Sequence, residues 1–130
     1  MNIIGLDHFV LTVNDIDKTI EFYTTVLGFK PEKFVSEGVE RSSLKFGQQK
    51  INLHQAGNEF KPGADRALPG TGDFCLITDT PVEGIARDLE GLGVEVLLGP
   101  LGRTGATGYL HSIYIRDPDK NLIEIANPID

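Results

Sequence analysis

The strongest constraint on the fold is an internal repeat, because the chain reads as one module written twice. One alignment lays His8–Val13 on Asp73–Thr78, and a second alignment, with a larger offset, lays His54 on Glu124. The change of offset means about five extra residues in the second copy, and we place them in the Gly-rich stretch 99–108. A copy of roughly 55–60 residues can hardly bury its apolar face alone, so we expect the two copies to share one core.

The first copy predicts a strand, a helix and a hairpin. Apolar side chains alternate over Leu6–Val13, which is typical of a half-buried strand. A helix is expected at about Asp15–Leu27, with Asn14 as its cap. Ser42–Phe46 and Ile51–Gln55 flank a polar turn and predict the hairpin.

The second copy predicts the same order of elements. Asp73–Thr78 is strand-like, and Thr80–Glu83 is typical of a capping box that begins a helix. Ser112–Arg116 and Leu122–Ala126 flank a strong turn signal. We expect a third hairpin strand in each copy, and we interpret the stretch 99–108 as either a lid or a surface insertion.

The predicted fold is α+β, with two βαβββ modules in tandem that form a single domain over residues 1–130. Module 1 spans about residues 4–57, the linker spans 58–70, and module 2 spans about 71–128.

Composition favours a small molecule as the partner. The net charge is −7, and the chain contains no run of Lys or Arg, which argues against binding to nucleic acid or to an anionic membrane. The N-terminus has no basic, apolar leader and no window is long enough to span a membrane, so we expect a cytoplasmic protein. The single cysteine, Cys75, lies in an apolar run and is expected to be a buried, inert thiol.

Four side chains with metal-binding atoms fall on two matched pairs of positions: His8, His54, Asp73 and Glu124. Two imidazoles and two carboxylates suit Zn²⁺, Fe²⁺, Mn²⁺, Co²⁺ or Ni²⁺ and leave coordination positions open for a substrate. Taken alone, each residue also fits an ordinary structural role. A single histidine is usually a core or surface residue, Glu124 fits a solvent-facing strand position, and Asp73 fits a turn.

Two segments resemble the vicinal oxygen chelate superfamily, which contains glyoxalase I, extradiol dioxygenases and bleomycin-binding proteins. They are His8–Val13 with Glu21–Phe29, and Arg116–Glu124. The resemblance covers nearly the whole chain and is closest to small glyoxalase domain-containing and virulence-related proteins, through Pro69–Leu76 and Arg103–Gly108. It implies a glyoxalase-like fold in which two βαβββ modules surround a metal-lined cleft.

The resemblance also implies ligation of a divalent ion (Zn, Ni, Co, Mn or Fe) by His8, His54, Asp73 and Glu124. The family commonly has Glu or Gln in place of His54 and His in place of Asp73, so His8 and Glu124 match its pattern best. The implied reaction is of the glyoxalase type, a lyase or isomerase step on a 2-oxoaldehyde–thiol hemithioacetal. Glu124 is the first choice for the base that moves the proton, and Asp73 is the second.

Two other functions stay open at this point. Two histidines with a carboxylate also match the Fe²⁺ site of an extradiol-type dioxygenase. A bleomycin-resistance-type protein would bind a small molecule in the same fold without catalysis. Arg41, Arg87 and Arg103 are candidates for contact with an anionic part of the substrate. By family precedent we expect a homodimer, since open sheets leave edges to cover.

Overall fold

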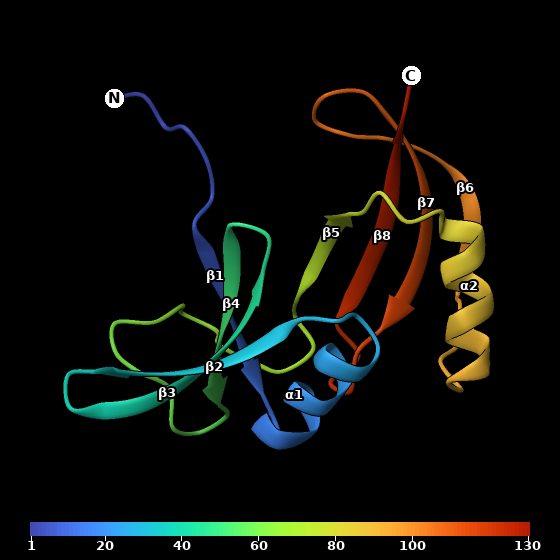
Figure 1. Ribbon diagram of the computed structural model, residues 1–130. Helices are drawn as coiled ribbons and strands as arrows, with labels where there is room; N and C mark the ends of the chain where they lie inside the picture. The colour runs from blue at the N-terminus through green and yellow to red at the C-terminus, as the bar shows by residue number, and fades with distance from the viewer. The chain divides into compact units, whose positions relative to one another are not determined.

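The computed structural model describes residues 1–130, which separate into two units, Met1–Thr71 and Gly72–Asp130 (Figure 1). Each unit contains one helix and one four-stranded sheet. The α+β class and the tandem βαβββ modules predicted from the repeat are therefore confirmed.

The two units repeat one order of elements. The first contains β1 (His8–Val13), α1 (Ile16–Thr25), β2 (Lys30–Ser36), β3 (Val39–Phe46) and β4 (Gln49–Gln55). The second contains β5 (Asp73–Ile77), α2 (Val82–Gly91), β6 (Leu98–Thr104), β7 (Tyr109–Arg116) and β8 (Leu122–Ile129). The third hairpin strand expected in each copy is present as β2 and β6.

The first and last strands of each unit pair in parallel. The sheet orders are β1-β4-β3-β2 and β5-β8-β7-β6, so the last strand of each unit lies inside its sheet. The remaining neighbours are antiparallel. Side chains from opposite ends of a unit therefore become direct neighbours on one sheet face.

Each sheet buries one face against its helix. In the first unit α1 contacts β2, β3 and β4, and in the second α2 contacts β7 and β8. The buried strand positions alternate, as a half-buried sheet requires. They are Leu11, Val13, Leu44, Ile51 and Leu53 in the first unit, and Ile113, Ile115, Ile123 and Ile125 in the second. Neither helix is long and apolar enough to cross a membrane.

Both predicted helix caps are wrong. The cap of α1 is Asp15 rather than Asn14, because the Asp15 carboxylate accepts a hydrogen bond from the backbone N–H of Lys18 at 3.1 Å. No side chain of the Thr80–Glu83 segment caps α2. The amide of Asn127, on β8, takes that role: its oxygen accepts from Val82 N–H at 2.9 Å, and its nitrogen donates to the carbonyls of Thr78 and Thr80.

The Gly-rich stretch 99–108 is neither a lid nor an insertion over most of its length, because β6 runs through it to Thr104. Strand β6 bulges between Leu98 and Leu101. Gly99 has a positive φ of 104°, and a Cβ there would collide with the carbonyl oxygen of Ser112. A bulge therefore explains one of these glycines.

Replacement of Gly99 by Ala should destabilise the protein by about 1–3 kcal/mol or more, because it combines a strained φ with a backbone clash. Gly102→Ala is the matched control in the same strand, since its Cβ would meet nothing within 4 Å. We expect its free energy of unfolding to stay within about 0.5 kcal/mol of wild type. Urea unfolding measures both, and equal stability of the two variants would contradict the bulge explanation.

Replacement of Asn127 by Ala should cost about 0.5–2 kcal/mol, the usual cost of a lost helix cap, because it leaves partly buried backbone groups at the start of α2 without partners. The control is Thr80→Ala, which removes the side chain that the capping box would have used. We expect that control to change stability by less than about 0.5 kcal/mol. Thermal unfolding measures both variants. A larger loss of stability in Thr80→Ala than in Asn127→Ala would support the predicted capping box and contradict the role of Asn127.

Candidate functional site

The second sheet places two carboxylates on the same face, away from α2. Asp73 begins β5 and pairs with Leu122 of β8, while Cys75 pairs with Glu124. Residues at every second position of a strand share a face, so Asp73, Cys75, Leu122 and Glu124 point to the same side. The parallel pairing therefore brings together side chains that lie far apart in the sequence.

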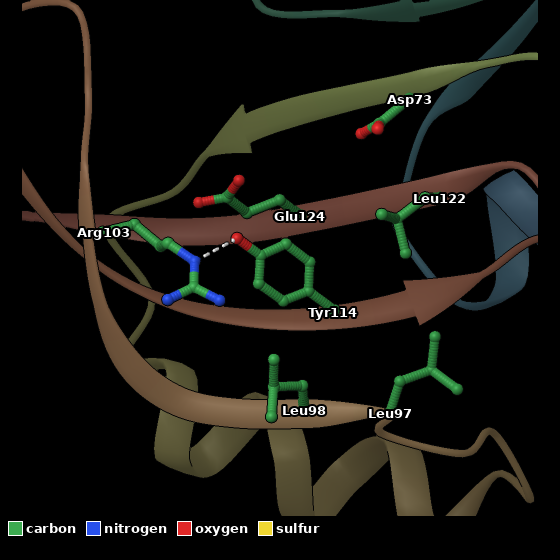
Figure 2. A pocket seen from close by; sticks show the side chains of 7 residues that line it. All are labelled: Asp73, Leu97, Leu98, Arg103, Tyr114, Leu122 and Glu124. Atoms are coloured by element: carbon green, nitrogen blue, oxygen red, sulfur yellow. Dashed lines mark hydrogen bonds between the residues drawn. The ribbon is translucent and has the colours of Figure 1, made fainter.

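This face is hollowed into a pocket of about 400 Å³. Figure 2 shows the carboxylates of Asp73 and Glu124 on adjacent strands, with the ring of Tyr114 beside Glu124. The lining combines polar groups with leucine side chains, and it consists of Asp73, Leu97, Leu98, Arg103, Tyr114, Leu122 and Glu124. A partly apolar pocket with a few convergent polar groups is typical of a small-molecule site.

A network of polar contacts holds Glu124 and its neighbours. The hydroxyl of Ser112 donates to Oε2 of Glu124 at 2.7 Å. Nε of Arg103 donates to the hydroxyl of Tyr114 at 2.8 Å, as the dashed line in Figure 2 marks. The pocket therefore contains a positioned carboxylate and a positioned phenol, each fixed by a second side chain.

The pKa values of two neighbours of Glu124, the thiol of Cys75 and the phenol of Tyr114, are raised. Partial desolvation of the sulfur atom, and then the charge and hydrogen bond of Glu124, raise the pKa of the Cys75 thiol to about 11. Burial and Glu124 also raise the pKa of Tyr114, while its hydrogen bond with Arg103 acts in the opposite direction. Both groups are thus protonated at neutral pH. Cys75 is exposed in the structure, so the prediction of a buried thiol is wrong.

The strand registers correct the equivalence of His54 and Glu124. Val10 pairs with Asn52 in the first unit, and Cys75 pairs with Glu124 in the second. Since the alignment that lays His8 on Asp73 also lays Val10 on Cys75, Glu124 corresponds to Asn52. His54 corresponds instead to the buried Ala126. The equivalent positions in the two copies are therefore His8 with Asp73 and Asn52 with Glu124.

The same register separates the two candidate histidines. His8 pairs with Lys50 and His54 with Thr12, four positions further along the strands. At ~3.3 Å per residue this separation is about 13 Å, which is too long for both imidazoles to bind one ion. Neither unit by itself gathers three His, Cys, Asp or Glu side chains around one point.

Each histidine nevertheless has a defined setting. Nδ1 of His8 lies 2.8 Å from a carboxylate oxygen of Asp7, an arrangement that leaves Nε2 free and is common among metal-binding histidines. The ring of His54 meets the ring of Phe60 edge-on, with 5.2 Å between the centroids. Burial, and then the charge of Arg41, lower the pKa of His54, so its imidazole is neutral at pH 7.

Sequence reasoning missed Ser112 and Tyr114 and left Arg103 as one of three candidate arginines. Ser112 and Tyr114 alternate along β7 and lie on the same face as Glu124, since Tyr114 pairs directly with it. Their alternation is visible in the sequence. Without the register between β7 and β8, however, Ser112 and Tyr114 look the same as ordinary surface residues. Arg41, another of these candidate arginines, has a side chain that is only 17% exposed.

Comparison with known proteins places this architecture in a large group. Residues 5–125 match the family model described as glyoxalase/bleomycin resistance protein/dioxygenase superfamily. The chain is 52% identical over 121 residues to virulence protein STM3117 of Salmonella typhimurium, covering 93% of this chain and 82% of that protein. A crystal structure of STM3117 has a TM-score of 0.94, covering 99% of this chain and all of the solved chain.

Two further proteins extend the comparison. Glyoxalase domain-containing protein RDO1 of Mycosarcoma maydis is 46% identical over 127 residues, which cover 98% of this chain and 70% of that protein. Lactoylglutathione lyase from Agrobacterium tumefaciens has a TM-score of 0.69 at 23% identity, covering 95% of this chain and 92% of the lyase. At that identity the likeness concerns the fold. The resemblance to glyoxalase-domain and virulence-related proteins is confirmed.

The thiol of Cys75 should react slowly with iodoacetamide, because a pKa of about 11 leaves roughly one thiolate per thousand thiols at pH 8. Glu124→Gln removes the neighbouring negative charge, lowers this pKa and should speed alkylation several-fold. Glu90→Gln on the exposed face of α2 is the control and should leave the rate unchanged. Equal rates in Glu124→Gln and wild type would show that Glu124 does not control the thiol.

Proposed function

Because the chain belongs to the glyoxalase/bleomycin resistance protein/dioxygenase superfamily, we propose that it is a divalent-metal-dependent glyoxalase-type lyase or isomerase. Its substrate would be a small oxygenated molecule such as a 2-oxoaldehyde–thiol hemithioacetal. The observation that carries this proposal is the pocket in which Glu124, fixed by Ser112, lies beside Asp73 and Tyr114.

In this proposal Glu124 is the base that moves a proton between neighbouring carbons of the substrate. The carboxylate takes the proton from the carbon that carries sulfur, and the electron pair of that C–H bond moves toward the adjacent carbonyl. Glu124 then returns the proton to the neighbouring carbon. The hydroxyl proton of the first carbon passes to the oxygen of the former carbonyl, so the product is a 2-hydroxy thioester. Asp73 is the second candidate for this base.

Three other features of the pocket would support the transfer. The hydrogen bond from Ser112 holds the carboxylate of Glu124 in one orientation, which fixes the direction of proton transfer. Tyr114 remains protonated, so its hydroxyl can donate to a developing negative charge on a substrate oxygen. Leu97, Leu98 and Leu122 give the pocket apolar surface for the rest of the substrate.

The donor atoms present fit a divalent ion. Carboxylate oxygens of Asp73 and Glu124 line one pocket, and His8 presents an imidazole whose other nitrogen is already paired with Asp7. Asp73 and Glu124 would hold the ion. Of the two other predicted ligands, His8 and His54, only one would complete the set, because the register separates them. A bound ion would polarise the substrate carbonyl.

Glu124→Gln should lower the kcat for isomerisation of the methylglyoxal–glutathione hemithioacetal by about 100-fold or more, the usual contribution of a general base. Glu90→Gln, which changes the same group on the exposed face of α2, should keep full activity. The wild-type protein is assayed after loading with each of Zn²⁺, Ni²⁺, Co²⁺, Mn²⁺ and Fe²⁺. Absence of isomerisation with all five ions would contradict the proposed reaction.

Titration with the same ions tests the ligands. Loss of a direct ligand should weaken binding by at least the 10–100-fold that loss of a supporting residue typically costs. We expect this effect for Asp73→Asn and Glu124→Gln. His8→Ala and His54→Ala, measured alongside, identify which imidazole belongs to the set, because the register separates the two. Unchanged binding in both carboxylate variants would contradict metal ligation in this pocket.

A binding protein without catalysis is the second candidate, favoured by the leucine side chains that line the pocket. Such a protein would bind a small molecule through the same face and would show no turnover. If Glu124→Gln still binds the methylglyoxal–glutathione hemithioacetal and the metal-loaded wild type does not convert it, the result would support a binding protein. An extradiol-type dioxygenase would instead consume oxygen in the presence of Fe²⁺ and a catechol.

A further inference from the structure

The phenol of Tyr114 is placed to act on an oxygen of a molecule whose carbon lies at Glu124. The two residues pair directly across β7 and β8, and directly opposed residues have Cβ atoms about 4.5–5.5 Å apart on one face. Figure 2 shows the phenol and the carboxylate together in the pocket. A carbonyl carbon and its oxygen are only about 1.2 Å apart, so one bound molecule can contact both groups.

The hydrogen bonds of the phenol leave its proton available to a bound molecule. Nε of Arg103 donates to the phenol oxygen at 2.8 Å, and a guanidinium cannot accept, so the phenol proton points elsewhere. In the free protein this proton is shared with Glu124 through a side-chain hydrogen bond. A substrate that enters between the two groups can take over both partners.

The other polar residues at the pocket are committed to different tasks. The hydroxyl of Ser112 is buried and donates to Glu124. Arg103 does not release a proton in proteins, and the leucines of the lining carry no acidic proton. Asp73 is assigned to the ion in the proposed function. Tyr114 is therefore the one neutral group of the lining that can both give and take a proton.

We infer, on the basis of the proposed function, that Tyr114 carries the second proton of the isomerisation, the one that moves between the two substrate oxygens. While Glu124 removes the proton from the carbon that carries sulfur, the phenol gives its proton to the carbonyl oxygen, and an enediol forms. The phenol oxygen then takes the proton of the other hydroxyl, and Glu124 returns its proton to the neighbouring carbon. Both residues end as they began, and the product is the 2-hydroxy thioester.

Arg103 is the positioning residue for this transfer, because it acts through Tyr114. Its Nε–H stays bonded to the phenol oxygen while that oxygen lacks a proton, and a charged donor binds an oxyanion strongly. The guanidinium is also held by the carbonyl of Gly102, to which Nη1 donates at 3.3 Å. Arg103 belongs to none of the protein's ion pairs, so its charge is available to the phenol.

The test separates cleavage of the C–H bond from formation of the product. Metal-loaded wild type and Tyr114→Phe are incubated with the methylglyoxal–glutathione hemithioacetal in D₂O. NMR measures the rate of deuterium entry at the carbon that carries sulfur and the rate of thioester formation. In Tyr114→Phe we expect kcat to fall by about 100-fold and the ratio of exchange to product to rise by about tenfold or more, because Glu124 remains and the carrier is lost. An unchanged ratio would overturn the inference.

The matched control is Tyr109→Phe, which removes the same hydroxyl from an exposed residue on the opposite face of β7. It should leave both rates unchanged, and a ratio raised as far as in Tyr114→Phe would contradict a specific role of Tyr114. Arg103→Gln should raise the ratio several-fold. Arg103→Lys, which restores a charged donor, should bring the ratio back toward the wild-type value. Equal ratios in Arg103→Gln and wild type would remove Arg103 from the transfer.

Two further outcomes separate the role of Tyr114 from the proposed function itself. If the wild type shows neither exchange nor product with any of the five ions, the proposed reaction is wrong and the role of Tyr114 is overturned with it. If the wild type isomerises the substrate, Glu124→Gln abolishes both rates and Tyr114→Phe behaves like wild type, the proposed reaction stands and only the role of Tyr114 is overturned.

Discussion

Parallel pairing between the first and last strands of each unit is the constraint on which the rest of the structure depends. In the second unit a buried hydrogen-bond network supports it: Asp117 accepts from the backbone and side chain of Asn121, and Asn121 Oδ1 accepts from Gly72 N–H at 2.7 Å. The turn that links β7 to β8 is thereby tied to the residue just before β5. Because this contact fixes the register, Asp73 and Glu124 lie on one face and line one pocket. The Arg116–Glu124 motif thus has a structural function as well as the expected chemical one.

Duplication has given two equivalent faces with opposite chemistry. In the first unit the matched positions hold His8 and Asn52 amid a row of lysines, and in the second they hold Asp73 and Glu124 amid leucines and a tyrosine. The backbone pairing that creates each face is the same, so the side chains alone set the difference. Lysines therefore surround one of these faces, whereas the other carries two carboxylates. The repeat therefore describes the architecture, whereas function depends on where the copies differ.

The sequence predicted those features that depend on local periodicity. Alternating apolar residues located the first strand, and the two helices were predicted close to α1 and α2, although both of their caps were wrong. The errors came from contacts between distant residues. Asn127 caps α2 from β8, far along the chain, and no local pattern reveals such a partner. The second alignment of the copies was displaced because short changes of length accumulate in the bulge and turns, and this error put His54 in the place of Asn52. The carboxylate pair was predictable, since both residues lie in strands with clear alternation.

The position of β4 and β8 has a consequence for the order in which the protein is made. Each is the last strand of its unit, yet each lies inside its sheet between an earlier strand and its hairpin partner. During synthesis, β5 has no strand to pair with and α2 has no cap until β8 has been made, because β8 supplies both. The first unit, by contrast, has its complete set of strands once Gln55 is made. Folding is therefore expected to proceed one repeat at a time, and termination before β8 would leave the second repeat without the strand that joins β5 to β7.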